Sequence, residues 1–266
     1  MKFSWSFAAF VLALAAILTE PTVAQDKASA VKAASEKTTP EKSAFTPAQR
    51  EELKVLFRDY LIKNPEVLAE AIQALQAKEE AAKEERREAT IAMFKDALYN
   101  PKEQTILGNL QGDITIVEFF DYNCGYCKSM FNDLISTIKS DGKIKLVLKE
   151  LPILGPNSVT ATKAALASRN QRKYPEFHQA LISYKGPVNE AAITAVAKGV
   201  GLNVEKLLED MKDPAFDDII EKNRDLAQAM DVTGTPALLV GGTFVGGAIG
   251  KDKLKNLIAD ARKQKS

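Results

Sequence analysis

Residues 113–127 read DITIVEFFDYNCGYC, and this stretch decides the fold. Residues 113–120 are rich in β-branched and aromatic side chains, which is typical of a buried strand. Residues 124–139 have the pattern of a helix. Cys124 and Cys127 therefore lie where a strand gives way to a helix, and this arrangement predicts an α/β fold with a cysteine pair at a strand–helix junction.

The chain after this stretch predicts the rest of an α/β fold. The expected elements are a strand at 143–148, a helical block at about 157–230, hairpin strands at 237–240 and 243–245, and a helix at 251–263. The helical block is interrupted near Gly186, Gly199 and Asp213. We therefore expect a β-α-β unit, a helical insertion and a closing β-β-α unit.

Two helices are predicted before the α/β part. Thr46-Pro47-Ala48-Gln49 combines a capping hydroxyl, a proline at the first helical position and a glutamine three residues after the cap. Asn64-Pro65 ends that helix and begins a second one, which we expect to reach about residue 96. The second helix has a heptad spacing at Leu68, Ile72, Leu75, Glu79, Ala82, Arg86, Ala89 and Met93.

This heptad allows two interpretations. Glu79 and Arg86 are poor residues for a seam between helices, so the helix could be a solvated one whose apolar end packs on its own domain. Alternatively, it is a stalk for self-association. We favour the second interpretation and expect residues 45–99 to form a helical region that joins copies of the chain as a dimer or a trimer.

The N-terminus has the three-part pattern of a secretory signal peptide. Lys2 is followed by twelve uncharged residues at 7–18 and by small residues before a predicted cleavage near Ala24. Twelve residues span about 18 Å as a helix, less than the roughly 30 Å of a hydrocarbon core. We therefore expect removal of residues 1–24, a flexible linker at 25–44, and a mature chain that is periplasmic or otherwise secreted.

Composition excludes several classes of function. The 266 residues carry a formal net charge of +1, from 36 basic and 35 acidic side chains, so no large positive field points to nucleic acid. The hydrophobic fraction of 45% excludes a chain that is disordered throughout. With one histidine, His178, and two cysteines, a zinc site within one chain lacks soft ligands unless carboxylates complete it. We expect no metal, no cofactor and no catalytic role for His178.

The spacing of Cys124-Gly125-Tyr126-Cys127 lets the two sulfurs bond within one helical turn. A loop this small removes little chain entropy, so the disulfide is better suited to exchange than to stabilisation. Cys124 at a helix N-terminus favours the thiolate, which is the species that attacks a disulfide. Cys127, one turn deeper, could resolve a mixed disulfide formed at Cys124.

Other interpretations of the pair stay open. The cysteines could be half of a zinc site completed across a dimer or a passive disulfide, although no second C-x-x-C supports zinc. They could also hold Cu(I) through two soft thiolates in a metal carrier. A third possibility is a surface scaffold whose stalk matters more than its thiols. We favour redox exchange because strand, cysteine pair and helix occur together.

Residues outside the pair support exchange chemistry. Glu118 lies in the apolar strand, where burial of a carboxyl group costs free energy unless the group has a partner or a role. Its role could be to accept or relay the proton of Cys127. Alternatively, the alternation of side chains along the strand places Glu118 on a solvated face of the sheet. Pro236 precedes a strand and can adopt the cis form, which would leave the backbone of Thr235 free to pair with an extended substrate. Side chains flanking the cysteines form either a docking surface for unfolded chains or plain packing: Tyr122, Tyr126 and Met130.

These motifs resemble the DsbA-like branch of the thioredoxin superfamily of bacterial secreted thiol–disulfide oxidoreductases. The resemblance covers about residues 100–266 and rests on FFDYNCGYC at 119–127, the helical insertion and GTPALLVGG at 234–242. Residues 56–76, LFRDYLIKNPEVLAEAIQALQ, resemble the N-terminal extension of ScsC and Com1-like members, many of which self-associate through it. The resemblance implies a thioredoxin-like catalytic domain with a large helical insertion, preceded by an N-terminal helical stalk.

The resemblance also implies roles for individual residues: Cys124 as nucleophile, Cys127 as resolving thiol, Glu118 as buried acid, and Thr235-Pro236 as the cis-proline loop. From its position between the cysteines, we expect Tyr126 to contact the substrate together with Thr235 and Pro236. Gly125 and Tyr126 replace the proline and histidine usual in the oxidase branch, and they match the disulfide isomerase DsbC. The implied function is disulfide exchange, with isomerase or reductase favoured over oxidase. The implied partners are unfolded or misoxidised secreted proteins and a membrane thiol-redox protein.

Overall fold

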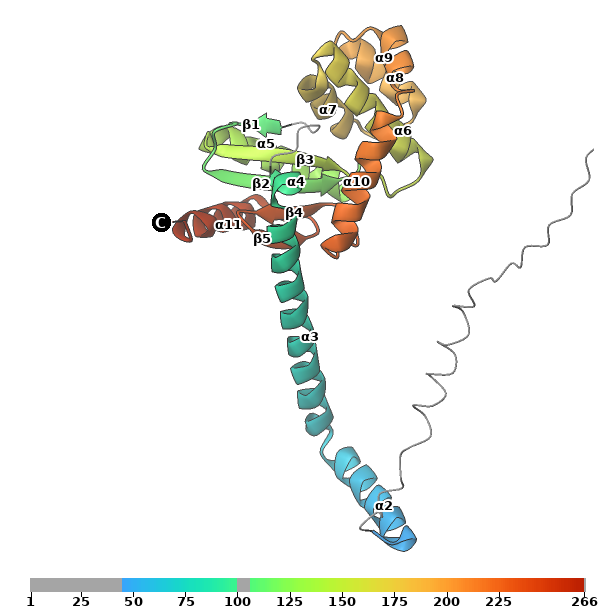
Figure 1. Cartoon of the computed structure of the whole chain (residues 1–266), viewed down its shortest axis with the longest axis vertical. Coiled ribbons are helices and arrows are strands. Elements are labelled where there is room, and N and C mark those ends of the chain that lie inside the picture. The colour runs from blue at the N-terminus through green and yellow to red at the C-terminus, as the bar shows by residue number, and fades with distance from the viewer. Residues whose placement is uncertain (1–44, 100–105, 266) are drawn as a thin grey trace, which may run out of the picture. The chain divides into compact units, whose positions relative to one another are not determined.

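The computed structural model of the chain describes residues 45–99 and 106–265 (Figure 1). The described residues divide into two compact units, with the boundary between Ile72 and Gln73. Three predictions lie outside the described residues: the signal peptide at 1–24, the linker at 25–44 and the domain start at residue 100. Across the described ranges, no helix has both the length and the apolar character needed to cross a bilayer.

The N-terminal helices begin where the sequence predicts, and the first of them also ends there. Helix α2 (Pro47–Lys63) has a complete capping box: the Gln49 N–H donates to the Thr46 hydroxyl (3.3 Å), and the Thr46 N–H donates to Gln49 Oε1 (2.8 Å). Asn64 caps its C-terminus, and α3 (Pro65–Met93) follows directly. The second helix is shorter than expected, because a turn at Phe94 separates it from α4 (Lys95–Tyr99).

A five-stranded mixed sheet forms the centre of the second unit, with the order β1-β3-β2-β4-β5. The strands are β1 (Ile106–Gly108), β2 (Ile114–Phe120), β3 (Ile144–Glu150), β4 (Ala237–Val240) and β5 (Thr243–Gly246). β2 and β3 are parallel, and the other neighbouring pairs are antiparallel. The sequence did not predict β1, because three residues at a sheet edge are too few to show a periodicity.

The helices of this unit include the predicted insertion. They are α5 (Gly125–Asp141), α6 (Pro156–Ala167), the 3₁₀ turn η1 (Ser168–Gln171), α7 (Tyr174–Ile182), α8 (Glu190–Gly199), α9 (Val204–Asp210), α10 (Ala215–Ala229) and α11 (Lys251–Lys263). The breaks expected near Gly186, Gly199 and Asp213 are confirmed. A further break at η1 was not predicted; it ends at Arg172, which has a positive φ of 56°.

Apolar side chains cover both faces of the sheet. Because side chains alternate along a strand, Ile116 and Phe120 of β2 join one core cluster, and Val117 and Phe119 join the other. The first cluster contains both cysteines and side chains of α5, α6, α7 and α11. The second contains residues of α4 and α10. The thioredoxin-like arrangement predicted from the sequence, a sheet with helices on both faces and a helical insertion, is confirmed (Figure 1).

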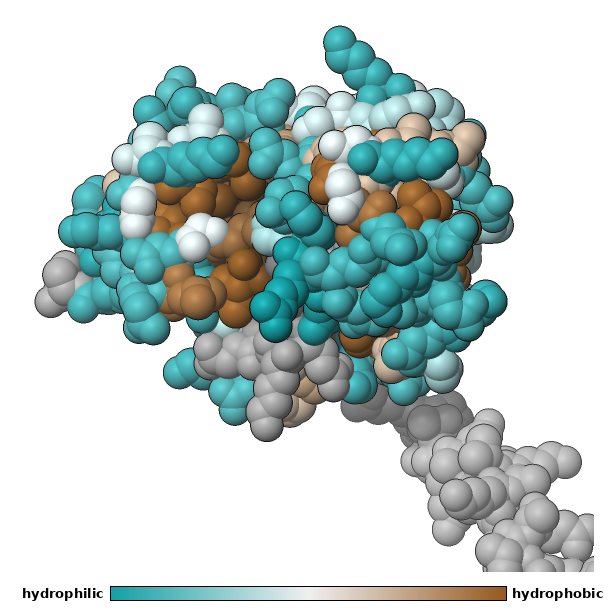
Figure 2. Space-filling model, turned by 90° about the horizontal axis from the view of Figure 1, so that it is seen from above, coloured by the Kyte–Doolittle hydropathy of each residue, from teal (hydrophilic) through white to brown (hydrophobic). Residues whose placement is uncertain are grey.

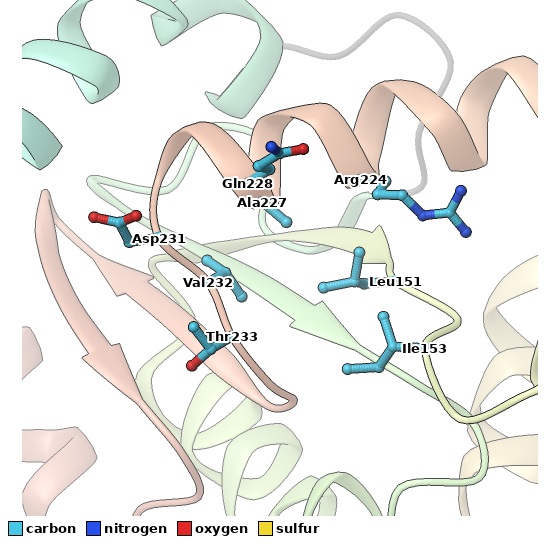
Figure 3. Close-up of a pocket in the computed structure, with 8 residues that line it drawn as sticks. All are labelled: Leu151, Ile153, Arg224, Ala227, Gln228, Asp231, Val232 and Thr233. Carbon is cyan, nitrogen blue, oxygen red and sulfur yellow. The ribbon is translucent and has the colours of Figure 1, made fainter.

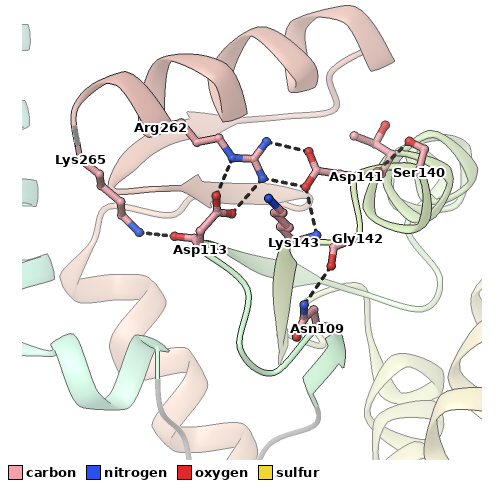
Figure 4. A network of polar contacts seen from close by, with 9 residues as sticks. Asn109, Asp113, Ser140, Asp141, Gly142, Lys143, Arg262 and Lys265 are labelled. Carbon is pink, nitrogen blue, oxygen red and sulfur yellow. Dashed lines mark hydrogen bonds and ion pairs between the residues drawn. The ribbon is translucent and has the colours of Figure 1, made fainter.

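One ionic cluster fixes the C-terminal helix to the sheet (Figure 4). The Arg262 guanidinium on α11 donates to both carboxylate oxygens of Asp113 (2.9 Å each) and to both of Asp141 (2.8 and 2.7 Å). Hydrogen bonds from Arg262 are the largest cause that lowers the pKa of both carboxyl groups. Arg262 thereby joins three elements that are distant in sequence: the approach to β2, the end of α5 and α11.

Candidate active site

The cysteine pair lies at the N-terminus of α5. Cys124 is the N-cap residue, and its Sγ accepts a hydrogen bond from the Cys127 N–H (3.4 Å). The Cys124 S–H donates to the backbone carbonyl of Thr235 (3.1 Å). Free N–H groups at a helix N-terminus stabilise a negative charge on an adjacent atom. The Cys124 sulfur therefore lies at the N-terminus of α5, directly beside the loop that ends at Pro236.

The loop before the cysteines is held by a buried carboxylate that the sequence analysis did not single out. Asp121 Oδ1 accepts from the Asn123 N–H (2.7 Å) and the Ser158 hydroxyl (2.8 Å). Asp121 Oδ2 accepts from the N–H groups of Ile153 (2.9 Å) and Leu154 (3.0 Å). Four hydrogen bonds compensate for the burial of this charge. An aspartate placed directly after a buried strand and before the cysteines was the signal available in the sequence.

The predicted cis-proline loop is confirmed in position and in peptide geometry. The Thr235–Pro236 peptide bond is cis. Thr235 is separated from Cys124 by 111 residues in sequence, yet its carbonyl contacts the Cys124 sulfur. The Thr235 N–H makes no hydrogen bond within the residues that the structure describes. It therefore offers a donor to an extended chain that approaches Cys124.

Glu118 is buried, with 3% of its surface exposed, so the alternative of a solvated sheet face was wrong. It lies two residues from both Ile116 and Phe120 on β2, and it therefore shares the sheet face that packs against the cysteine-containing core. Burial raises the pKa of Glu118 to about 8. Burial is also the largest cause that raises the pKa of Cys127, and the nearby charge of Glu118 raises it further. A proton can thus be shared between two buried groups.

Two polar residues beside the cysteines hold a segment of the helical insertion. Asn123 Oδ1 accepts from the Val188 N–H (2.7 Å), and Asn123 Nδ2 donates to the Val188 carbonyl (3.3 Å). Lys128 Nζ donates to the carbonyls of Tyr184 (2.9 Å) and Gly186 (2.7 Å). The insertion is therefore anchored at the active-site loop through its 184–188 segment.

The three side chains considered as a docking surface separate into two groups. Tyr126 is 72% exposed, whereas Tyr122 and Met130 are buried and belong to the core. Ile153 and Leu154, which are tied to the active-site loop through Asp121, are also exposed. Figure 2 shows hydrophobic surface gathered in separate brown areas between hydrophilic side chains. Only Tyr126 of the three candidates is available to a client.

A mostly apolar groove of about 500 Å³ lies between the end of β3, the end of α10 and the segment that leads to Thr235 (Figure 3). Leu151 and Ile153 line one side, and Ala227 and Val232 line the other. The groove was not predicted, since it is formed by segments far apart in the sequence.

His178, to which we assigned no catalytic role, is buried among aromatic rings. Its Nδ1 lies 2.8 Å from the Tyr122 hydroxyl, and its ring stacks on Tyr174 at a centroid distance of 5.6 Å. Burial lowers the pKa of His178 to about 3. Among the described residues, no group of three or more histidine, cysteine or acidic side chains has a metal-binding arrangement.

Comparison with known proteins agrees with this geometry. The family model of the DSBA-like thioredoxin domain matches residues 115–259, and that of the copper resistance protein ScsC N-terminal domain matches residues 49–82. A thioredoxin-like oxidoreductase from Silicibacter pomeroyi is 40% identical, with a TM-score of 0.62; the match covers 64% of this chain and 98% of that one. A linker-deletion variant of Proteus mirabilis ScsC is 26% identical, with a TM-score of 0.64, over 84% of this chain and 99% of that one.

Curated relatives include two kinds of protein. Disulfide bond formation protein D of Bacillus subtilis is 27% identical over 179 residues, covering 62% of this chain and 79% of that protein. Two Salinispora proteins named as Na⁺/H⁺ antiporters are each 24% identical, but the chain spans only 25% and 22% of their length. The match to the thioredoxin domain, by contrast, extends over more than half of the chain and includes both cysteines, Glu118 and Pro236. The chain belongs to the DSBA-like thioredoxin domain family.

Proposed function

We propose that this chain is a thiol–disulfide oxidoreductase that exchanges disulfides in client proteins through Cys124 and Cys127. The observation that carries the proposal is the position of the Cys124 sulfur, which caps α5, contacts the Thr235 carbonyl and lies beside a second, more deeply buried thiol. A nucleophilic sulfur, a resolving sulfur and a backbone edge for a client are thus brought together.

The exchange proceeds in balanced steps. The Cys124 thiolate attacks one sulfur of a client disulfide, forms a mixed disulfide and releases the other client sulfur as a thiolate. For isomerisation, a second client thiolate attacks the mixed disulfide and regenerates Cys124. For reduction, Cys127 attacks Cys124, which releases a fully reduced client and leaves a Cys124–Cys127 disulfide.

Glu118 serves the resolving step. Cys127 must lose its proton before it attacks, and its raised pKa makes that loss unfavourable without a base. In its ionised form, the Glu118 carboxyl group, which lies on the sheet face that packs against the cysteine-containing core, accepts this proton and returns it when Cys127 is released again. Tyr126, which is exposed between the cysteines, contacts the client.

We favour an isomerase or reductase over an oxidase. Isomerisation benefits from several active sites held together in one assembly. A surface for such an assembly is available, because the apolar side chains of α2 and of the start of α3 lack a partner within the described chain. Leu68 and Ile72 at the predicted seam are both about half exposed. Their burial against copies of the chain, as a dimer or a trimer, would provide that assembly. A mature chain in the periplasm or another secreted location, served by a membrane thiol-redox partner, fits the predicted signal peptide.

The test measures the rescue of a scrambled multi-disulfide protein. The variant L68E/I72E places charges in the seam and is expected to lower both oligomer mass and rescue activity, while reaction with a small disulfide is unchanged. The matched control is Q73E, which adds the same kind of charge at an exposed position of α3 outside the heptad seam. If the native chain oxidises reduced clients rapidly but cannot rescue scrambled ones, the isomerase assignment fails.

A second candidate is a Cu(I)-binding thiol protein, favoured by the adjacent thiols of Cys124 and Cys127 and by the name of the family that matches residues 49–82. Stoichiometric Cu(I) binding without turnover of any disulfide would support this candidate. Turnover of disulfides by the metal-free chain would exclude it as the main function.

A further inference from the structure

The last turns of α3 pack against the segment that carries the cis-proline loop. Arg87 is 6% exposed, and its guanidinium lies 4.0 Å from the centre of the Phe244 ring on β5. Its Nε donates to the Met230 carbonyl (3.4 Å), and the Thr90 hydroxyl, which lies 2.9 Å from the Arg86 carbonyl, also lies 3.3 Å from the Ala229 carbonyl. The carbonyls of Ala229 and Met230 lie at the C-terminus of α10, where free carbonyl groups and the helix dipole favour a nearby cation and a hydroxyl donor. This part of α3 is thus anchored where α10 leads to Thr235.

Between this helix and the loop lies a mostly polar cleft of about 710 Å³. One wall is α3, through Glu80, Lys83 and Arg87, and the other includes Thr235 and Pro236. Thr235 belongs to both the cleft and the redox site, because it lines the cleft and its carbonyl contacts the Cys124 sulfur. A client strand that pairs with the Thr235 backbone therefore has α3 beside it.

Among the charged side chains that line this cleft, we expect Lys83 to have the strongest electrostatic interaction with a client. It is half-buried, and it makes no ion pair within the described part of the chain. Arg87 is already paired with Glu84. Three other charged residues that line the cleft are exposed, so water and salt screen their charges more strongly: Glu80, Asp231 and Lys253.

We propose that the anchored end of α3 is part of the client-binding site, and that Lys83 selects extended client segments with an acidic side chain close to the reacting cysteine. The proposal rests on the proposed function and deepens it. The helix that carries the self-association seam in its first half then carries client recognition in its last half.

The test uses two disulfide-linked peptides that differ only in having glutamate or lysine beside the cysteine. Each turnover forms the Cys124–Cys127 disulfide and releases two peptide thiols. The second-order rate constant of the reduced full-length chain is measured with each peptide and with the neutral bis(2-hydroxyethyl) disulfide. We expect the native chain to prefer the acidic peptide, and Lys83→Glu to change the ratio of the two rate constants by about threefold to tenfold towards the basic peptide.

Lys78→Glu is the matched control, because it makes the same charge reversal at an exposed position of α3 outside the cleft. Lys83→Gln should give an intermediate ratio. Reaction with the neutral disulfide should be the same in all variants, which shows an intact redox site. If the ratio of the two rate constants is unchanged in Lys83→Glu, or if Lys78→Glu changes it equally, the role of Lys83 is overturned while the proposed function stands. No reaction of the native chain with any of the three disulfides would instead overturn the proposed function.

Discussion

Helices α2 and α5 have the same length, 17 residues each, but opposite relations to the rest of the chain. α5 buries six side chains, namely Cys127, Met130, Phe131, Leu134, Thr137 and Ile138. α2 buries none, although it carries Val55, Leu56, Phe57, Tyr60 and Ile62, which are between 51% and 64% exposed. The described chain therefore supplies a core for one helix and leaves the apolar residues of the other uncovered.

This difference separates two tasks. α5 must hold a sulfur in a fixed geometry, and its six buried side chains pack it firmly against the rest of the unit. α2 exposes contiguous apolar surface, which in a soluble protein marks a contact with another molecule. The comparison is consistent with the proposal that the packed helix carries the chemistry and the uncovered helix carries the assembly.

The largest expected effect comes from the N-cap of α5. Cys124→Ser keeps a capping side chain but removes the nucleophile, so the rate of disulfide exchange should fall by about a thousandfold or more. Stopped-flow measurements with a small disulfide test this, and circular dichroism should show unchanged helix content. Substantial remaining activity would show that the packed helix does not carry the chemistry.

The second prediction contrasts one leucine in each helix. Leu134→Ala leaves a cavity in the core and should lower the free energy of unfolding by about 3 kcal/mol. Leu56→Ala removes an exposed side chain and should change it by less than about 0.5 kcal/mol in dilute solution, where copies are separated. Urea denaturation measures both. Similar losses at low concentration would mean that α2 has a core partner in its own chain.

The third prediction concerns the pH dependence of the free energy of unfolding that results from the burial of Glu118. The raised pKa of Glu118, about 8 in the folded chain, means that folding favours its neutral form. Its contribution to stability is therefore most favourable at low pH and declines as pH rises from about 4.5 to about 8. Glu118→Gln, which cannot ionise, should lack this decline.

Urea denaturation at pH 5 and pH 8 measures the effect. The native chain should lose on the order of 3 kcal/mol more than Glu118→Gln between these two values. Resolution of a mixed disulfide by Cys127 should also slow in the variant, because the proton acceptor is absent. Parallel stability profiles would contradict the buried position of the carboxyl group.

The smallest expected effect is at the ionic cluster around Arg262 (Figure 4). Arg262→Ala should lower the free energy of unfolding by about 1 kcal/mol, since the bidentate pairs are partly exposed. Because the pKa values of Asp113 and Asp141 are lowered, this contribution is present at neutral pH and is lost as pH falls through those values. Arg224→Ala, which removes a single exposed pair with Glu221, is the control and should have a smaller effect.

The sequence by itself determined the elements that depend on neighbours along the chain. The capping box at Thr46, the end of α2 before Pro65 and the hairpin turn at Gly241-Gly242 follow from local hydrogen bonding and backbone freedom. The cysteine at the start of α5 belongs to the same class. A periodicity of a few residues is enough to predict such features, whereas the three-residue β1 is too short to show one.

Only the tertiary structure decided which distant groups meet. The contact of Cys124 with Thr235 spans 111 residues, and the four donors to Asp121 come from three different segments. On α3 it is Arg87, not a residue of the predicted heptad, that is buried. Helical spacing predicts faces, but the face that packs is chosen by the surface it meets, here the end of α10 and Phe244. Long-range packing has no local periodicity, which is why the sequence predicted the reactive pair but not the cleft beside it.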